Sequence, residues 1–191
     1  MSNIKVHRSS IYVSSSKSIL QRLLNYFSFV WSSYWVGLSK LEKQYDFVLC
    51  ESPPLFLGIS SYLLAKRKNA KFIFNVSDLW PESAEKLGLV SNRIFLRLAQ
   101  YLEESLYKKA NLITGQTQGI VHNIRSTFPK KDVYWLPNGV DLSFYNPSKI
   151  ESNWREKNSF SASDKLFLYA GIIGHAQGLE VILKAAKILE G

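Results

Sequence analysis

Apolar residues recur along the chain with two periods, one typical of helices and one typical of buried strands. Between residues 16 and 40 they return every three or four positions, which predicts a helix with a buried face. That face comprises Leu20, Leu23, Leu24, Phe27, Val30, Trp31, Tyr34, Leu38 and Leu41. A second stripe is polar and comprises Gln21, Asn25, Ser28, Ser32 and Ser39. A third stripe places aromatic residues between basic ones and comprises Arg22, Tyr26, Phe29, Ser33, Val36 and Lys40.

Short apolar runs alternate with helical patterns from residue 47 onward. Strands are predicted over residues 47–50, 71–76, 112–114 and 133–136, and helices over 55–66, 92–109 and 118–127. Residues 4–13 alternate loosely and are predicted to form an edge strand. Such alternation indicates βαβ units, so the predicted fold class is α/β, with a Rossmann-like parallel sheet flanked by helices. Ligands of these sheets bind beyond the carboxyl ends of the strands.

The last part of the chain predicts a change of domain. Residues 146–163 are polar and are interpreted as a linker, and residues 166–170 then restart as a strand. A glycine-rich turn and a helix over 179–189 follow, which is the opening of a second Rossmann-like unit. We therefore expect a partial N-terminal domain over 1–145, the linker, and the start of a C-terminal domain over 164–191.

Charge and composition narrow the possible partners. The net charge of +9 favours anionic partners, but the basic residues are scattered and no nucleic-acid-binding motif accompanies them, so no nucleic-acid partner is expected. The single cysteine, Cys50, is predicted to be a buried thiol in a reducing cytosol. The three histidines lack metal-ligand spacing and no D-x-D pair occurs, so no metal site is expected.

Three short motifs together resemble one enzyme family. They are DLWPES at 78–83, PNGVD at 137–141 and YAGIIGHAQGL at 169–179. In order and spacing they resemble the GT-B type retaining glycosyltransferases of family four, especially the bacterial subgroup that builds capsule, O-antigen and colanic-acid-type polysaccharides. The resemblance implies metal-independent transfer of a hexose from a nucleotide-sugar, as co-substrate and without a cofactor, to a lipid-linked or growing saccharide.

Within this resemblance, the turn after residue 170 is expected to approach the diphosphate of the donor. Its candidate residues are Gly171, Gly174, Gln177 and Gly178. Glycines let backbone amides approach a phosphate, and a helix N-terminus adds a favourable dipole. The alternative is that they only close a tight turn. The family also uses a basic residue and two glutamates eight positions apart, and no such glutamate pair occurs here. The chain is therefore expected to be truncated at both ends and inactive by itself.

The acceptor side of the resemblance centres on Asp78. A carboxylate there is expected either to orient a sugar hydroxyl, as the catalytic candidate, or to cap a helix N-terminus. Trp80 is expected either to stack on the face of a sugar or to pack in the hydrophobic core of the domain. Asn138 and Gly139 are interpreted as an interdomain hinge facing the cleft, or as a purely structural turn. The complete set of acceptor-binding candidates is Ser52, Pro53, Pro54, Trp80 and Glu82.

The predicted helix over 16–40 also suggests a location. It is slightly short for a bilayer span. Its third stripe is instead expected to contact an anionic membrane surface, which implies a cytoplasmic protein held peripherally at the inner face of the cytoplasmic membrane. The alternative is that all its aromatic residues belong to the core. Two other functions stay open: a catalytically inactive remnant that keeps only acceptor or membrane binding, and a sugar-nucleotide epimerase of the same two-domain architecture.

Overall fold

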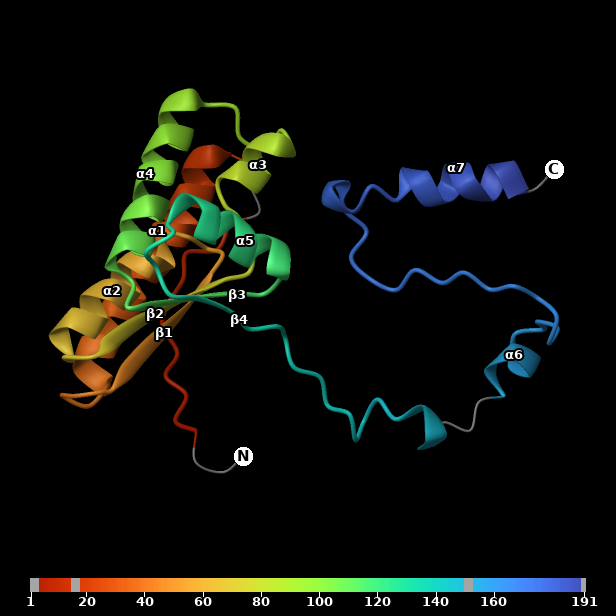
Figure 1. Ribbon diagram of the computed structural model, residues 1–191, viewed down its shortest axis with the longest axis horizontal. Coiled ribbons are helices and arrows are strands. Elements are labelled where there is room, and N and C mark those ends of the chain that lie inside the picture. Colours follow the sequence, from red (N-terminus) through yellow and green to blue (C-terminus); the bar gives the residue numbers. More distant parts are fainter. Residues whose placement is uncertain (1–3, 15–17, 150–152, 190–191) are drawn as a thin grey trace. The chain divides into compact units, whose positions relative to one another are not determined.

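The computed structural model describes residues 4–14, 18–149 and 153–189. The chain separates into two compact units, residues 1–138 and residues 139–191. The first unit contains the sheet and most of the helices, and the second contains short helical segments and one longer helix (Figure 1).

The first unit is built on one parallel sheet of four strands in the order β1-β2-β3-β4. The strands are β1 (Phe47–Ser52), β2 (Lys71–Val76), β3 (Leu112–Gly115) and β4 (Val133–Trp135). The helices are α1 (Ile19–Lys40), α2 (Leu57–Arg67), α3 (Glu82–Lys86), α4 (Arg93–Lys109) and α5 (Gln118–Thr127). The predicted α/β class with a Rossmann-like parallel sheet is therefore confirmed.

The core lies between one face of the sheet and α2, α4 and α5. Right-handed crossovers that step in one direction along a parallel sheet place their helices on one face, and Figure 1 shows these three helices on one side of the strands. Cys50, Phe74 and Ile113 occupy neighbouring positions on β1, β2 and β3, and all three are buried. Burial raises the pKa of the Cys50 thiol to about 11, which keeps it protonated and confirms the predicted buried thiol.

Side chains at the helix ends explain where the helices begin. The Asn92 side chain accepts hydrogen bonds from the backbone N–H groups of Ile94 and Phe95 at the start of α4. The Thr117 hydroxyl accepts one from Ile120 at the start of α5, at 3.2 Å. These bonds satisfy backbone donors that a helix cannot pair by itself. Both helices match their sequence predictions within one residue at each end.

Helix α1 forms where it was predicted, but its orientation differs from the prediction. It packs on α2 through small residues: Gly37 lies against Leu64, and the hydroxyls of Ser33 and Ser60 are 3.2 Å apart. Phe29 and Val36, which were expected on a membrane-facing stripe, are half-buried. The expected buried face is divided: Val30 is buried and Leu23, Tyr34, Leu38 and Leu41 are half-buried, but its other four residues are exposed. The exposed stripe comprises Leu20, Leu24, Phe27, Trp31 and Trp35, whose exposed fractions are 45–66%.

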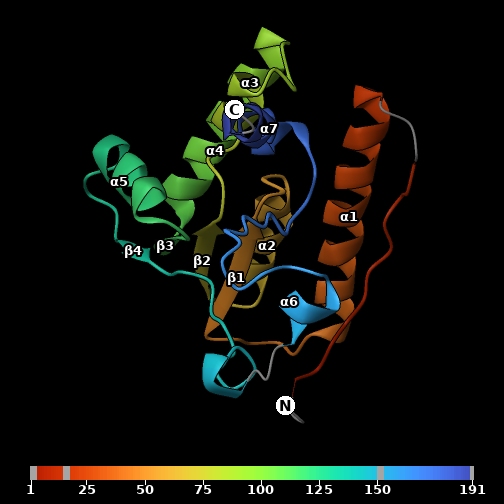
Figure 2. The ribbon, with the colours of Figure 1, turned by 90° about the vertical axis from the view of Figure 1, so that its right-hand side faces the viewer.

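The predicted edge strand over residues 4–13 is wrong. This segment belongs to no strand and runs alongside α1 (Figure 2). The Asn25 amide donates to the Tyr12 carbonyl at 2.6 Å, and the Tyr12 N–H donates to the Ser28 hydroxyl at 2.8 Å. The Ser32 hydroxyl donates to the Ser10 carbonyl. The polar stripe of α1 thus satisfies backbone groups that a neighbouring strand would otherwise pair.

No helix in the described part of the chain has the length and apolar character needed to cross a membrane.

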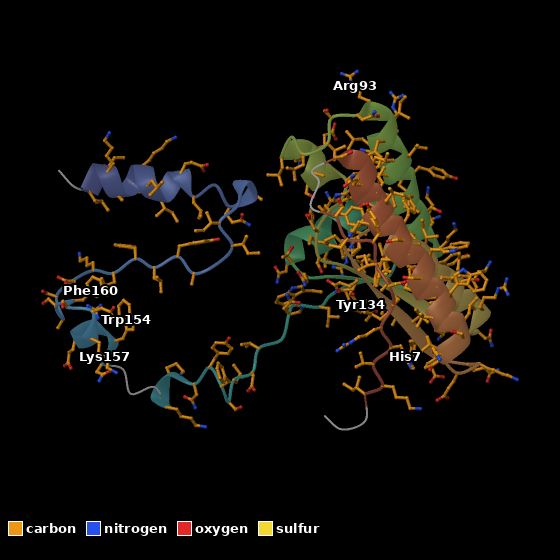
Figure 3. All side chains as sticks on the ribbon, turned by 180° about the vertical axis from the view of Figure 1, so that it is seen from behind. His7, Arg93, Tyr134, Trp154, Lys157 and Phe160 are labelled. Atoms are coloured by element: carbon orange, nitrogen blue, oxygen red, sulfur yellow. The ribbon has the colours of Figure 1, made fainter. Side chains whose placement is uncertain are left out.

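The second unit contains α6 (Trp154–Lys157), α7 (Glu180–Leu189) and two 3₁₀ turns, Pro147–Lys149 and His175–Gln177. Part of the predicted linker is therefore helical, and the rings of Trp154 and Phe160 stack with centroids 5.4 Å apart (Figure 3). The predicted strand over 166–170 does not form in the described residues. A strand needs a partner for its backbone groups, and this unit offers none, so Phe167 and Leu168 are 85% and 84% exposed.

Candidate functional site

The carboxyl ends of the four strands form one polar edge of the first unit. Hydrogen bonds continue beyond each strand: Ser77 N–H donates to the Ser52 carbonyl at 2.8 Å, and Gln116 N–H donates to the Val76 carbonyl at 3.0 Å. The turns that leave β1, β2 and β3 therefore begin side by side, in the strand order that Figure 2 shows. Ligands of parallel α/β sheets bind at this edge, so this is the candidate site.

Asp78 lies at this edge, two residues beyond β2, and its side chain is exposed. Its carboxylate accepts a hydrogen bond from the Ser83 hydroxyl at 2.8 Å. The alternative role of helix cap is wrong, because α3 has Pro81 at its N-cap position and no side-chain cap. The carboxylate is thus held by one hydroxyl and is open to solvent.

Trp80 is held in an aromatic cluster rather than standing free. Its ring centroid lies 5.5 Å from that of Phe56 and 6.0 Å from that of Phe95. Phe56 in turn contacts Phe27 of α1, with centroids 4.9 Å apart. Aromatic pairs at these separations stabilise packing. The contacts of Trp80 therefore favour its core role, although its half-buried side chain keeps part of its surface accessible.

The remaining acceptor candidates differ in accessibility. Ser52 is 2% exposed, so its side chain offers almost no surface to a ligand. Pro53 is exposed and Pro54 is half-buried in the turn after β1. Glu82 is half-buried and pairs with Lys86, with 2.5 Å between Oε1 and Nζ. Of the five candidates, Pro53 is the most open to solvent.

Asn138 and Gly139 lie at the boundary between the two units. The Gln116 amide donates to Asn138 Oδ1 at 2.7 Å, which ties Asn138 to the end of β3. Nothing lies within 4 Å of the position that a Cβ of Gly139 would occupy. These features are compatible with both predicted roles, the hinge and the structural turn.

The glycine-rich turn of the second unit contains Gly171, Gly174, Gln177 and Gly178. Gly178 has a φ of +58°, a conformation that glycine adopts without strain. A Cβ at Gly174 would lie 2.7 Å from the Gln177 side-chain oxygen, and Gln177 N–H donates to the Gly174 carbonyl at 3.2 Å. The turn therefore favours glycine at position 178 through its φ, whereas a side chain at position 174 would only have to displace the flexible end of Gln177; the phosphate role stays a prediction.

Sequence analysis missed a chain of hydrogen bonds that crosses the sheet beside Asp78. Glu51, Asn75 and Thr114 occupy one row across β1, β2 and β3. The Thr114 hydroxyl donates to Asn75 Oδ1 at 2.6 Å, and the Asn75 amide donates to Glu51 Oε2. The Ser77 hydroxyl donates to Glu51 Oε1. In each strand a polar residue stands next to apolar ones, a pattern that the sequence shows. That these three residues are neighbours follows only from the strand register.

A second carboxyl group with altered acidity lies on α4. Burial raises the pKa of Glu103 to about 7, and the hydrogen bond from the Tyr107 hydroxyl, at 2.7 Å, opposes this rise. The nearby carboxylates of Glu82 and Glu104 raise the pKa further. The folded protein therefore holds a proton on Glu103 more tightly than the unfolded chain does.

This difference predicts a pH-dependent stability. The pKa of Glu103 in the folded state exceeds its ordinary value of 4.5. Protonation of Glu103 therefore contributes fully to the free energy of unfolding below pH 4.5, and this contribution is lost as the pH rises through about 7. We expect Glu103→Gln, which stays neutral, to raise the urea midpoint at pH 8 relative to the wild type and to remove this pH dependence. Glu85→Gln, which removes an exposed carboxylate on α3 that does not affect the pKa of Glu103, is the matched control. A Glu103→Gln midpoint equal to wild type at pH 8 contradicts the prediction.

Among the described residues, no group of three or more histidine, cysteine, aspartate or glutamate side chains is placed to hold a metal ion.

Comparison with known proteins finds a similar curated protein but no matching family model. No family model matches the sequence. The chain is similar to a protein of Escherichia coli K12 named putative colanic acid biosynthesis glycosyl transferase WcaI, with 26% identity over 190 residues. The match covers 96% of this chain and 47% of that protein, so the chain spans about half the length of this curated relative.

Proposed function

We propose that this chain belongs to a glycosyltransferase that acts in the synthesis of a bacterial surface polysaccharide, and that its parallel sheet forms the acceptor-binding part. The observation that carries this proposal is the similarity over 96% of the chain to a protein named for colanic acid biosynthesis. The polar carboxyl edge of a Rossmann-like sheet supports it, because such edges are where ligands bind.

The proposed reaction transfers a hexose from a nucleotide-sugar to a hydroxyl of a lipid-linked or growing saccharide, with retention of configuration and without a metal. Asp78 is proposed to accept a hydrogen bond from the acceptor hydroxyl and to orient it, since its carboxylate is exposed at the carboxyl edge. Negative charge develops on the departing diphosphate, and the amides around Gly171 and Gly174 are proposed to stabilise it.

The test requires the donor side to be complete. The glutamate pair expected of a donor domain is absent from these residues, so we expect no transfer by the 191-residue chain alone. A chimera, in which this chain replaces the matching residues of the Escherichia coli relative, supplies the remainder. Transfer of radiolabelled sugar from nucleotide-sugars to extracted lipid-linked saccharides supports the proposal. Interconversion of nucleotide-sugars without an acceptor indicates an epimerase instead.

A peripheral position on an anionic membrane surface completes the proposal. The exposed stripe of α1 supports it, because it includes two tryptophans, which favour the headgroup region, and apolar Leu20, Leu24 and Phe27, which favour the acyl boundary. The rings of Trp31 and Trp35 lie 5.9 Å apart, edge to face, and α1 contains no acidic residue. The net charge of +9 adds attraction to anionic lipid.

Substituting both tryptophans tests this membrane contact. Each ring that leaves water on binding contributes about 1.5–3 kcal/mol, so the double variant Trp31→Ser, Trp35→Ser should bind phosphatidylglycerol vesicles at least about tenfold more weakly in co-sedimentation. Tyr101→Ser, which removes a ring that is 74% exposed on α4, is the matched control and should bind as the wild type does. Wild-type binding should weaken with salt. A wild-type chain that ignores these vesicles at low salt rules the membrane role out.

A further inference from the structure

The carboxylate of Glu51 is held in one orientation by the chain of hydrogen bonds across the sheet. Its two oxygens are engaged separately, Oε2 by the Asn75 amide and Oε1 by the Ser77 hydroxyl. Asn75 is itself fixed, because Thr114 donates to its Oδ1 at 2.6 Å and both residues are buried, 7% and 6% exposed. A buried anchor on two strands thus positions an exposed acidic group on a third.

This carboxylate keeps unused acceptor capacity on its exposed side. Each carboxylate oxygen can accept about two hydrogen bonds, and each receives one from the network described above. None of the ion pairs among the described residues involves Glu51. Ser77, whose hydroxyl binds it, directly precedes Asp78 in the turn that leaves β2, so Glu51 belongs to the same carboxyl edge of the sheet.

These features select among ligand chemistries. A carboxylate without a cationic partner repels a phosphate or diphosphate, so the donor's diphosphate does not fit beside Glu51. A metal ion needs further ligands, and no cluster of three suitable side chains exists in the described part. A pair of adjacent sugar hydroxyls supplies two donors in the geometry that a carboxylate accepts, and it needs no counter-charge.

We propose that Glu51 is a saccharide-binding residue: its carboxylate, held by Asn75 and Ser77, accepts hydrogen bonds from two neighbouring hydroxyls of the acceptor sugar. This inference rests on the proposed function, and it assigns the acceptor's chemical class to a specific group. The buried Asn75–Thr114 pair makes Glu51 a preorganised acceptor, which reduces the entropy lost when a sugar binds.

Glu51→Gln tests the proposal with little structural change. The Gln oxygen still accepts from Asn75 and its amide donates to the Ser77 hydroxyl, so the network persists while the charge is lost. The probes are methyl α-glucoside, methyl α-galactoside and methyl N-acetyl-β-glucosaminide, with binding to the 191-residue chain measured by saturation-transfer NMR titration. At least one glycoside should bind the wild type, and Glu51→Gln should weaken it by about tenfold or more, as expected for bonds to a charged group.

Two further variants separate binding from folding. Glu104→Gln removes an exposed carboxylate on α4 and should bind as the wild type does, with urea unfolding as the check on folding. Ser77→Ala keeps the charge of Glu51 but frees one of its carboxylate oxygens, so it should weaken glycoside binding less than Glu51→Gln does. If Glu51→Gln does not fold, glycoside binding by Ser77→Ala that equals wild-type binding overturns the proposal.

The possible outcomes distinguish this inference from the proposed function. Equal binding by the wild type and Glu51→Gln, or no binding of any glycoside, overturns the saccharide role of Glu51. If binding depends on Glu51 but the chimera transfers no sugar, the site stands and the proposed function fails. If chimeras with Glu51 and with Glu51→Gln both transfer sugar and have the same acceptor KM, the proposed function stands and the saccharide role of Glu51 fails.

Discussion

Replacing Phe74 by alanine is expected to lower the free energy of unfolding by about 3–5 kcal/mol, the range for loss of a buried aromatic ring. Phe74 is 1% exposed on β2, and its ring centroid lies 5.7 Å from that of Phe72 and 5.9 Å from that of Tyr107 on α4. A Cβ at Gly58 of α2 would lie 3.2 Å from its ring. The sheet and two helices therefore meet on this side chain, and its removal leaves a cavity that they cannot easily fill.

Urea unfolding, followed by far-UV circular dichroism, measures this loss. A loss of this size removes much of the roughly 5–15 kcal/mol that stabilises a typical domain, so the midpoint should fall sharply. The matched control is Phe167→Ala, whose ring is 85% exposed in the second unit; it should change stability by no more than about 0.5 kcal/mol. Equal midpoints for the two variants would show that Phe74 is not at the centre of the core.

Asp78→Asn is expected to reduce sugar transfer by the chimera by about a hundredfold, the loss typical of a misplaced reacting group, because the acceptor hydroxyl loses the carboxylate that orients it. In the wild type the Ser83 hydroxyl donates to the Asp78 carboxylate at 2.8 Å. The side-chain oxygen of Asn can accept the same hydrogen bond, so the substitution is conservative. Only the charge and one acceptor oxygen are lost, so the rate should fall while stability stays unchanged.

Ser83→Ala separates orientation from chemistry. It removes the hydroxyl that binds Asp78 and keeps the carboxylate, so a smaller loss of rate is expected than for Asp78→Asn. Initial rates at saturating nucleotide-sugar, with acceptor varied, provide the comparison. Unchanged kinetics in Asp78→Asn would leave Asp78 with no role in transfer, and since it caps no helix, only its bond to Ser83 would remain.

The strands and most helices could be predicted because their signals are local. β2 is a continuous run rich in apolar residues and formed over the predicted residues 71–76, and α5 formed over the predicted 118–127. A short run of apolar residues ending in a polar turn predicts a buried strand without knowledge of its neighbours. The same locality placed Asp78 at the end of a strand, and the structure confirms that position.

The errors came from features that depend on a partner. Apolar residues occur on two stripes of α1, so periodicity predicted the helix but not that residues of both stripes would be partly buried. Gly37 and Ser33 allow close approach to Leu64 and Ser60. Residues 4–13 look like a strand, but α1 supplies their hydrogen bonds. The row of Glu51, Asn75 and Thr114 depends on strand register, which cannot be predicted from local sequence patterns.

The most direct test of the proposed glycosyltransferase function is sugar transfer by the chimera in which this chain replaces the matching residues of the Escherichia coli relative. Nucleotide-sugar binding and a cooperative urea transition establish that the chimera is folded and that its donor side works. If this chain belongs to a glycosyltransferase, radiolabel should then appear in the lipid-linked saccharide fraction. A folded, nucleotide-sugar-binding chimera that leaves this fraction unlabelled, with acceptors that the intact relative does label, would contradict it.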